Sequence, residues 1–392
     1  MRQDMELKEK VKKEIYETFF RYRRREGVPN EREDFMATRP QDLCNYDYEI
    51  EWGMLLQVVL NDARNAIISS EAGRRQINIR ELEDIRQEIL TLEDSVPQDL
   101  DRIQFYRDRY EELISTQSVI EMNNRQDSFK IDGERPSAFF LNLEKHRVSD
   151  NYISRLRDGN ELITDQKKIE KCIHGYYEEL YENKDDLRTN ISIEDYIQQI
   201  GIDIAPKLDE DKKRSLEGEI RKEEIEKVLK KTKDRSAPGI SGITYTFFKD
   251  YWELLGDLLT NAFNESFRLG KIPDFMSRGL ISLLPKGTKD RSYLKNWRPI
   301  TLLECSYKLL SGVLATRLNS VVNSLVHPSQ KGFVPNRNIA ENSRTFIDIL
   351  DYAKRTGTGG TAIVLDYEKA FDTLSHTYFR EVLNFFGFGE DY

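Results

Sequence analysis

Apolar residues in the first third of the chain recur at helical spacing, with charged residues between them. They form two stripes: Leu7, Val11, Ile15 and Phe19, then Ile103, Tyr106, Tyr110 and Leu113. A spacing of three or four residues places such side chains on one face of a helix, where they pack against a neighbour. We assign these stripes no chemistry, because packing explains them. Residues 1–125 are therefore predicted to be a helical arm or linker.

The pattern changes near residue 153. Asp158-Gly159 lies between two short runs of residues, which predicts a β-hairpin. Asp165 is placed to cap a following helix. That helix would have one apolar face, formed by Ile169, Ile173, Tyr176 and Leu180. Residues 183–218 are polar and acidic, and we expect a poorly defined linker there.

From residue 236 onward the chain is richer in apolar residues, and predicted helices and strands interleave. A short charged helix is expected just before this part, at about 222–233. Within it the helices are expected at about 244–269, 306–325 and 375–387, and the strands at 280–284, 300–303 and 362–366. Asn338 and Glu341 have the spacing of a capping box at the start of one more helix. Because the strands and helices do not alternate in a regular βαβ order, the pattern indicates an α+β fold.

Charge is unevenly distributed along the 392 residues, whose formal net charge is −9. Between Lys271 and Arg317 there are nine basic and three acidic residues, a local charge of +6. That segment could face phosphates although the chain as a whole could not. The three widely spaced cysteines suit a reducing compartment and no zinc site. No segment has the length of a membrane span, so we expect an intracellular protein without a membrane partner; nucleus and cytoplasm are not separated.

Asp366 is the first candidate for chemistry, because it directly follows the apolar run 362–365. An ionised carboxylate at the end of a buried strand is costly unless a cation compensates it. Such an oxygen could bind Mg²⁺ together with substrate phosphates. The alternative is an aspartate that caps the next turn.

Lys286 and Arg298 form the second candidate pair, each at the edge of a predicted strand, with a basic loop between them. Arginine can grip a phosphate through two hydrogen bonds and lysine acts as a point charge, so together they would suit a triphosphate. Taken singly, each could be an ordinary solvated charge at the end of a strand.

Several sequence blocks, in order and at plausible spacing, resemble the reverse transcriptase of LINE-type, non-LTR retrotransposons. The blocks are Pro238-Gly239, LLPK (283–286), NWRPITLLECSYKLLS (296–311), SQKGFVPNR (329–337) and VLDYEKAFD (364–372). The upstream stretch GERPSAFFLNLEKHR (133–147) resembles the segment that precedes the polymerase in that family. One departure is Ser241, where the family commonly has aspartate.

The resemblance implies roles for individual residues. Asp366 matches the first catalytic aspartate, which binds Mg²⁺, and Phe371 matches the bulky residue that excludes a 2′-hydroxyl. Lys286 and Arg298 match residues that contact the incoming triphosphate. Gln330 lies in a block near the template and nucleotide. The implied partners are an RNA template, a DNA primer and deoxynucleoside triphosphates; protein partners are unknown.

The resemblance also divides the chain into part of a right-hand polymerase and the segments that precede it. Residues 1–125 would be the helical arm, 126–235 a pre-polymerase segment, 236–337 the fingers and 338–392 the start of an incomplete palm. The family's aromatic-x-Asp-Asp hairpin does not occur between Asp366 and Tyr392, and the Asp185-Asp186 pair lies upstream in a polar stretch. We therefore expect a truncated, inactive polymerase. The alternative is a non-catalytic RNA-binding remnant that uses the basic segment.

Overall fold

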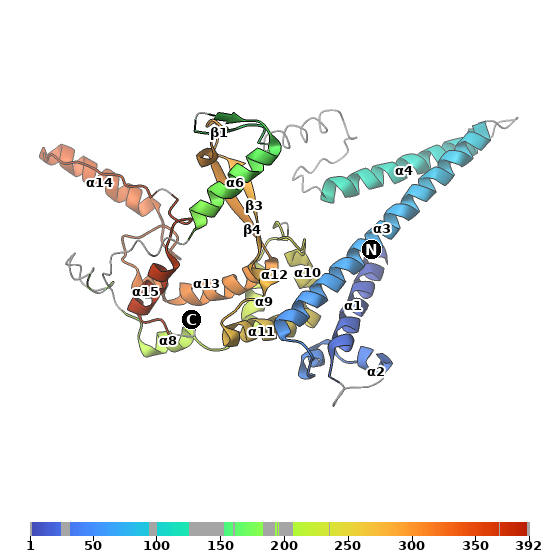
Figure 1. Cartoon of the computed structure of the whole chain (residues 1–392), viewed down its shortest axis with the longest axis horizontal. Coiled ribbons are helices and arrows are strands. Elements are labelled where there is room, and N and C mark those ends of the chain that lie inside the picture. The colour runs from blue at the N-terminus through green and yellow to red at the C-terminus, as the bar shows by residue number, and fades with distance from the viewer. Residues whose placement is uncertain are drawn as a thin grey trace. The chain divides into compact units, whose positions relative to one another are not determined.

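The computed structural model forms two compact units (Figure 1), each described here by itself. Unit 1 comprises residues from 1–152, 229–285 and 298–307, and unit 2 residues from 153–228, 286–297 and 308–392. Within these ranges the structure describes residues 2–24, 32–93, 100–124, 153–159, 161–182, 193, 195, 207–234, 236–367 and 369–389. The expectations for 133–147 and for Asp185-Asp186 lie outside the described residues.

Unit 1 begins with helices that carry the predicted apolar stripes. They are α1 (Arg2–Tyr22), α2 (Arg32–Met36), the 3₁₀ helix η1 (Pro40–Asn45), α3 (Trp52–Glu93) and α4 (Leu100–Asn124). Val11, Ile15 and Phe19 are fully buried, because α1 packs against α3. In Figure 1 α4 runs beside α3, and Ile103 on α4 is buried. The predicted helical arm is thus formed by helix-on-helix packing.

The rest of unit 1 consists of α10 (Tyr245–Asp250), α11 (Trp252–Leu269), α12 (Asp274–Ser277), β3 (Gly279–Pro285) and most of β4 (Trp297–Leu303). β3 and β4 pair as a two-stranded sheet. α11 packs on α3, and its Glu265 carboxylate accepts hydrogen bonds from the backbone N–H groups of Trp52 (3.0 Å) and Gly53 (2.7 Å). This carboxylate satisfies N–H groups at the start of α3 that have no acceptor within that helix.

Unit 2 contains the predicted hairpin, β1 (Leu156–Asp158) and β2 (Glu161–Ile163), which pair antiparallel. Asp165 caps α6 (Gln166–Tyr181) by accepting a hydrogen bond from the N–H of Lys168 at 3.0 Å. The other helices are α8 (Glu210–Leu216), α9 (Lys222–Lys231), α13 (Cys305–Leu325), α14 (Ala340–Thr356) and α15 (His376–Phe386); α9 and α13 each continue into unit 1. A small core unites α8, α13 and the segment after α15 through Leu216, Val321, Leu325 and Phe388.

Three sequence-based predictions need correction. The segment 183–218 contains the helix α8, whose cap Asp209 accepts from the N–H of Lys212 at 2.8 Å. The predicted strand 362–366 is not a strand: residues 361–367 are irregular and exposed. A strand needs a partner for its backbone hydrogen bonds, and among the described residues the sheets contain only β1–β2 and β3–β4.

The predicted capping box at α14 is also wrong. Asn338 Oδ1 accepts from the N–H of Ala340 at 2.9 Å, one residue earlier than a box requires. The Glu341 carboxylate pairs with Lys331 Nζ at 2.5 Å rather than turning back to Asn338. An ammonium group within reach attracts a carboxylate more strongly than a backbone N–H does. The fold overall is helix-rich with small sheets, in agreement with the predicted α+β class.

Candidate functional site

Lys286 follows β3 and starts a loop, residues 286–296, that leads into β4. Its backbone N–H donates to the carbonyl of Asn296 at 2.8 Å, and its Nζ donates to the carbonyl of Lys295 at 2.7 Å. The indole Nε1 of Trp297 donates to the carbonyl of Arg291 at 2.8 Å, which closes the loop from its far end. The ammonium group of Lys286 is thus held by a hydrogen bond at the start of a loop whose two ends are joined to each other.

Arg298 is exposed on β4. It belongs to unit 1, whereas Lys286 belongs to unit 2. The expected pairing of the two cations on one triphosphate therefore stays a prediction.

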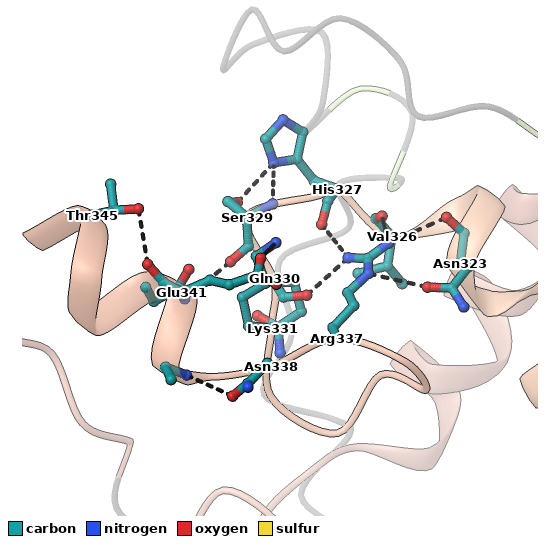
Figure 2. Close-up of polar contacts among 12 residues, drawn as sticks. Asn323, Val326, His327, Ser329, Gln330, Lys331, Arg337, Asn338, Glu341 and Thr345 are labelled. Atoms are coloured by element: carbon teal, nitrogen blue, oxygen red, sulfur yellow. Dashed lines mark hydrogen bonds and ion pairs between the residues drawn. The ribbon is translucent and has the colours of Figure 1, made fainter.

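Arg337 organises the loop between α13 and α14 (Figure 2). Its Nε donates to Asn323 Oδ1 at 3.1 Å. The terminal nitrogens donate to four carbonyls, of His327 (2.6 Å), Gln330 (2.8 Å), Asn323 (3.2 Å) and Val326 (2.9 Å). A guanidinium has five N–H donors, so all of them are engaged. Arg337 is therefore a structural residue that closes the end of α13, a role that the sequence pattern did not reveal.

Gln330 lies inside the loop that Arg337 closes. Its side-chain Nε2 donates to the carbonyl of Gly332 at 3.1 Å, and the side chain is exposed. The adjacent Lys331 is tied to Glu341 on α14. Figure 2 also shows the contact between His327 Nδ1 and the Ser329 hydroxyl, which lie 2.7 Å apart. The loop is thus a locally hydrogen-bonded platform that keeps the Gln330 side chain accessible.

Phe333 and Phe371 bring two separate sequence blocks together. Their ring centroids lie 6.4 Å apart in an edge-to-face arrangement, and the side chains are 99% and 88% exposed. Phe333 has a backbone φ of +61°, a conformation that costs a non-glycine residue about 1–2 kcal/mol. Strain of this kind is concentrated at functional sites. The pair marks the surface where blocks 329–337 and 364–372 meet.

The turn that carries Phe371 is attached to α6. The Tyr181 hydroxyl donates to Asp372 Oδ1 at 3.1 Å, and Lys369 Nζ lies 4.9 Å from the centroid of the Tyr176 ring. Burial raises the pKa of the Tyr181 phenol, and the neighbouring Asp372 carboxylate raises it further. A raised pKa keeps the phenol neutral, so its O–H stays available as the hydrogen-bond donor to the Asp372 carboxylate. Sequence patterns singled out Tyr176 as a packing residue only.

Asp366 lies in the exposed segment 361–367, five residues before Phe371. A carboxylate oxygen is the type of ligand that hard divalent cations prefer. Among the described residues, however, no group of three His, Cys, Asp or Glu side chains could hold a metal ion. Asp366 therefore has suitable donor chemistry but is a single ligand in this arrangement.

Ser241, the departure from the expected aspartate, has a clear partner. Its backbone N–H donates to Glu304 Oε1 at 2.8 Å and its hydroxyl to Oε2 at 2.5 Å. Glu304 is buried, and Gly239 packs against its backbone. The loop 236–242 is thus fastened to the junction of β4 and α13. No local sequence pattern predicted this contact, because a glutamate that follows an apolar strand is usually an ordinary surface residue.

Comparisons with known proteins identify relatives of this chain. Residues 284–391 match the family model described as reverse transcriptase (RNA-dependent DNA polymerase). The "Transposon TX1 uncharacterized 149 kDa protein" of Xenopus laevis is 33% identical over 263 residues, which are 67% of this chain and 19% of that protein.

Two relatives are described as retrovirus-related Pol polyproteins of R2 retrotransposable elements. The one from Drosophila melanogaster is 31% identical over 153 residues, 39% of this chain and 14% of the relative. The one from Popillia japonica is 31% identical over 172 residues, 44% of this chain and 23% of the relative. The chain thus spans less than a quarter of each of these proteins.

Proposed function

We propose that this chain, whose residues 284–391 belong to the reverse transcriptase family of non-LTR retrotransposons, forms the nucleotide-binding part of an RNA-directed DNA polymerase. The observation that carries the proposal is the order of the blocks inside the matched region. LPK (284–286), NWRP, QKGF and LDYEKAFD occur there in succession. In this proposal residues 236–337 are the fingers and 338–392 the first part of the palm.

The proposed contacts with nucleotide rest on exposed polar groups. Lys286 and Arg298 would bind the triphosphate, the first as a point charge and the second through two parallel hydrogen bonds. Gln330 would lie near the template base. The exposed ring of Phe371 would occupy the space of a 2′-hydroxyl, which would favour deoxynucleotides, and the edge of Phe333 supports that ring from one side.

Asp366 is proposed as a ligand of Mg²⁺. Bound divalent ions would stabilise the charge that develops between an attacking 3′-hydroxyl and a leaving pyrophosphate. The contribution of Asp366 is then to hold a carboxylate oxygen beside the triphosphate. The attachment of the 369–373 turn to α6 supports this role, because it limits where the neighbouring backbone can move.

Nucleotide binding tests the proposal on the 392-residue chain itself. The wild-type chain should bind a fluorescent deoxynucleoside triphosphate in the presence of Mg²⁺. Lys286→Ala should weaken the affinity for this nucleotide several-fold. Lys354→Ala on the exposed face of α14 serves as the charge-matched control. No binding by the wild-type chain, or equal binding by the Lys286 variant, would contradict the proposed role of the loop.

Primer extension is a separate measurement. We expect no extension by the 392-residue chain with Mg²⁺ and deoxynucleotides, since a two-metal site needs carboxylates in addition to Asp366. Extension that disappears in Asp366→Asn would show this expectation to be wrong. Sequencing the transcript past the codon for Tyr392 would show whether an aromatic-x-Asp-Asp stretch follows.

A second candidate function is RNA binding without catalysis. The observation that favours it is the set of exposed cations in the loop 286–296, in a chain of net charge −9. Phosphate contacts make binding strongly dependent on salt. Salt-sensitive RNA binding that is weakened by Lys295→Ala and Arg298→Ala, in the absence of nucleotide binding, would favour this alternative.

A further inference from the structure

Phe371 is so exposed that packing does little to fix the direction of its ring. The side chain is 88% exposed, and Phe333, which its ring meets edge-to-face, is 99% exposed. Exposed side chains exchange rotamers rapidly, so the average direction of such a ring depends on the backbone that carries it. The orientation of Phe371 therefore depends on the turn 369–373.

One carbonyl closes this turn. The oxygen of Lys369 accepts hydrogen bonds from the N–H groups of Asp372 at 2.9 Å and Thr373 at 3.1 Å, and from the Thr373 hydroxyl at 3.0 Å. Lys369 itself has a φ of +53°, in the left-handed region that a non-glycine residue rarely adopts. Such a conformation persists only where the surrounding structure holds it.

Two side chains of α6 hold the turn, one on each side of Phe371, and all of these residues belong to unit 2. The Tyr176 ring centroid lies 4.9 Å from Lys369 Nζ, and the Tyr181 hydroxyl donates to Asp372 Oδ1 at 3.1 Å. One anchored residue comes two positions before Phe371 and the other directly follows it. The backbone between the two anchors therefore has little freedom to rotate.

Tyr177 keeps the two anchoring rings in place. It is buried, its ring is stacked on that of Tyr181 with centroids 6.1 Å apart, and it meets the Tyr176 ring edge-to-face at 5.1 Å. Its hydroxyl has no hydrogen-bond partner among the described residues, and burial raises the pKa of this phenol to about 12. Tyr177 thus acts through its ring, as a neutral support for both anchors.

We propose that Tyr176 and Tyr181 are positioning residues for sugar selection, because they fix the turn that directs the Phe371 ring toward the 2′ position of a bound nucleotide. The inference rests on the proposed role of Phe371 and extends it to α6, which lies upstream of the matched residues 284–391. Specificity is a difference between two affinities. Loosening the turn should therefore reduce the discrimination between deoxynucleotides and ribonucleotides and leave the affinity for the deoxynucleotide nearly unchanged.

Competition binding to the 392-residue chain measures this discrimination. A deoxynucleoside triphosphate with a fluorescent label on its γ-phosphate is bound in the presence of Mg²⁺ and displaced by unlabelled dATP or ATP. The ratio of the two inhibition constants is the discrimination ratio. Tyr181→Phe removes the O–H donor and keeps the stacked ring, and we expect this ratio to fall about fivefold, as for the loss of one hydrogen bond. An unchanged ratio would overturn the proposal.

Conservative variants separate the anchors from general packing. Asp372→Asn keeps an acceptor oxygen and should discriminate like the wild type, whereas Asp372→Ala should behave like Tyr181→Phe. Tyr176→Phe keeps the ring face near Lys369 and should change little, whereas Tyr176→Leu should lower the ratio. Tyr177→Phe is the control for the aromatic cluster. A loss of discrimination in Tyr177→Phe as large as that in Tyr181→Phe would contradict the proposal, because the effect would then come from packing alone.

Amide hydrogen exchange tests the anchoring without any nucleotide. The N–H groups of Asp372 and Thr373 should exchange faster in Tyr181→Phe than in the wild type, because the turn opens more often once one anchor is lost. Equal exchange rates would show that α6 does not hold the turn.

Phe371→Ala separates this inference from the proposed function. It should abolish the discrimination, with the turn still anchored. If Phe371→Ala lowers the ratio and Tyr181→Phe does not, α6 does not position the ring, while the proposed role of Phe371 stands. If the wild-type chain binds both nucleotides equally, or binds neither, the proposed role and this inference are both wrong.

Discussion

Arg317 and Glu224 form a bidentate ion pair inside unit 2. Arg317 Nε donates to Glu224 Oε1 and Nη2 to Oε2, each at 2.9 Å. Only 10% and 19% of the two side chains are exposed. The remaining donors of Arg317 reach the carbonyls of Leu216, Gly218 and Glu219. The pair therefore joins the ends of α8 and α9 to α13, the helix that carries the loop closed by Arg337.

Because of this pair, we expect the free energy of unfolding to decrease at acid pH. The hydrogen bond from Arg317 holds the pKa of Glu224 below its ordinary value. A lowered pKa in the folded state stabilises the protein above the unfolded pKa of about 4.3, and the stabilisation disappears as the pH falls through the folded value. Glu224→Gln should lower the free energy of unfolding by about 2 kcal/mol at pH 7. It should also reduce the loss of stability below about pH 4.

Urea unfolding at pH 7 and pH 3 measures both effects. Glu223→Gln changes the exposed neighbour in the same helical turn and is the control, with little expected change. Equal stability of Glu224→Gln and the wild type at pH 7 would mean that the pair contributes nothing to folding.

Arg337→Lys should loosen the loop between α13 and α14. Lysine keeps the charge but has three donors on one atom, so it cannot reach the five acceptors that the guanidinium joins. We expect a loss of about 2–3 kcal/mol in local stability, measured as faster amide hydrogen exchange over residues 323–337. Arg344→Lys, at an exposed i,i+4 ion pair on α14, is the matched substitution and should change exchange little.

Gly239→Ala should destabilise unit 1. An alanine Cβ would lie 2.7 Å from the backbone nitrogen of Glu304 and 2.8 Å from its Cα, and backbone atoms cannot rotate away. The expected loss in the free energy of unfolding is about 1–3 kcal/mol. Gly332→Ala is the control, because nothing lies within 4 Å of its new Cβ. In thermal unfolding, Gly239→Ala should have a clearly lower midpoint temperature than Gly332→Ala. Equal midpoints would show that the backbone around Glu304 shifts to accommodate the new Cβ.

The segment 363–365 should make the chain prone to self-association. Ile363, Val364 and Leu365 are 78%, 90% and 81% exposed, and a run of exposed apolar residues with extended sequence character can pair with strands of other chains. Sedimentation velocity should show concentration-dependent association that Ile363→Ser/Leu365→Ser reduces. Ile77→Ser/Ile79→Ser, at exposed positions of α3, should leave it unchanged.

Local rules predicted much of the secondary structure. The stripes of α1 and α4, the Asp165 cap, the Asp158-Gly159 turn, and the last helix, which Ser375 caps, are confirmed. These features depend on neighbours within a few residues, which the sequence displays directly. The family resemblance of residues 284–391 is likewise confirmed. The roles of Asp366, Lys286, Arg298, Gln330 and Phe371 remain proposals.

The sequence by itself determined several of the helices, the hairpin and the family resemblance, because periodicity, caps and ordered blocks are properties of neighbouring residues. Tertiary structure alone decided which polar groups meet. Arg337 closes its loop, Ser241 binds Glu304 and Arg157 docks on Ser292, because folding brings their partners within hydrogen-bond distance. The segment 362–366 shows that a local pattern is not sufficient without a tertiary partner. Its apolar pattern favours a strand, but a strand exists only where another strand accepts its hydrogen bonds.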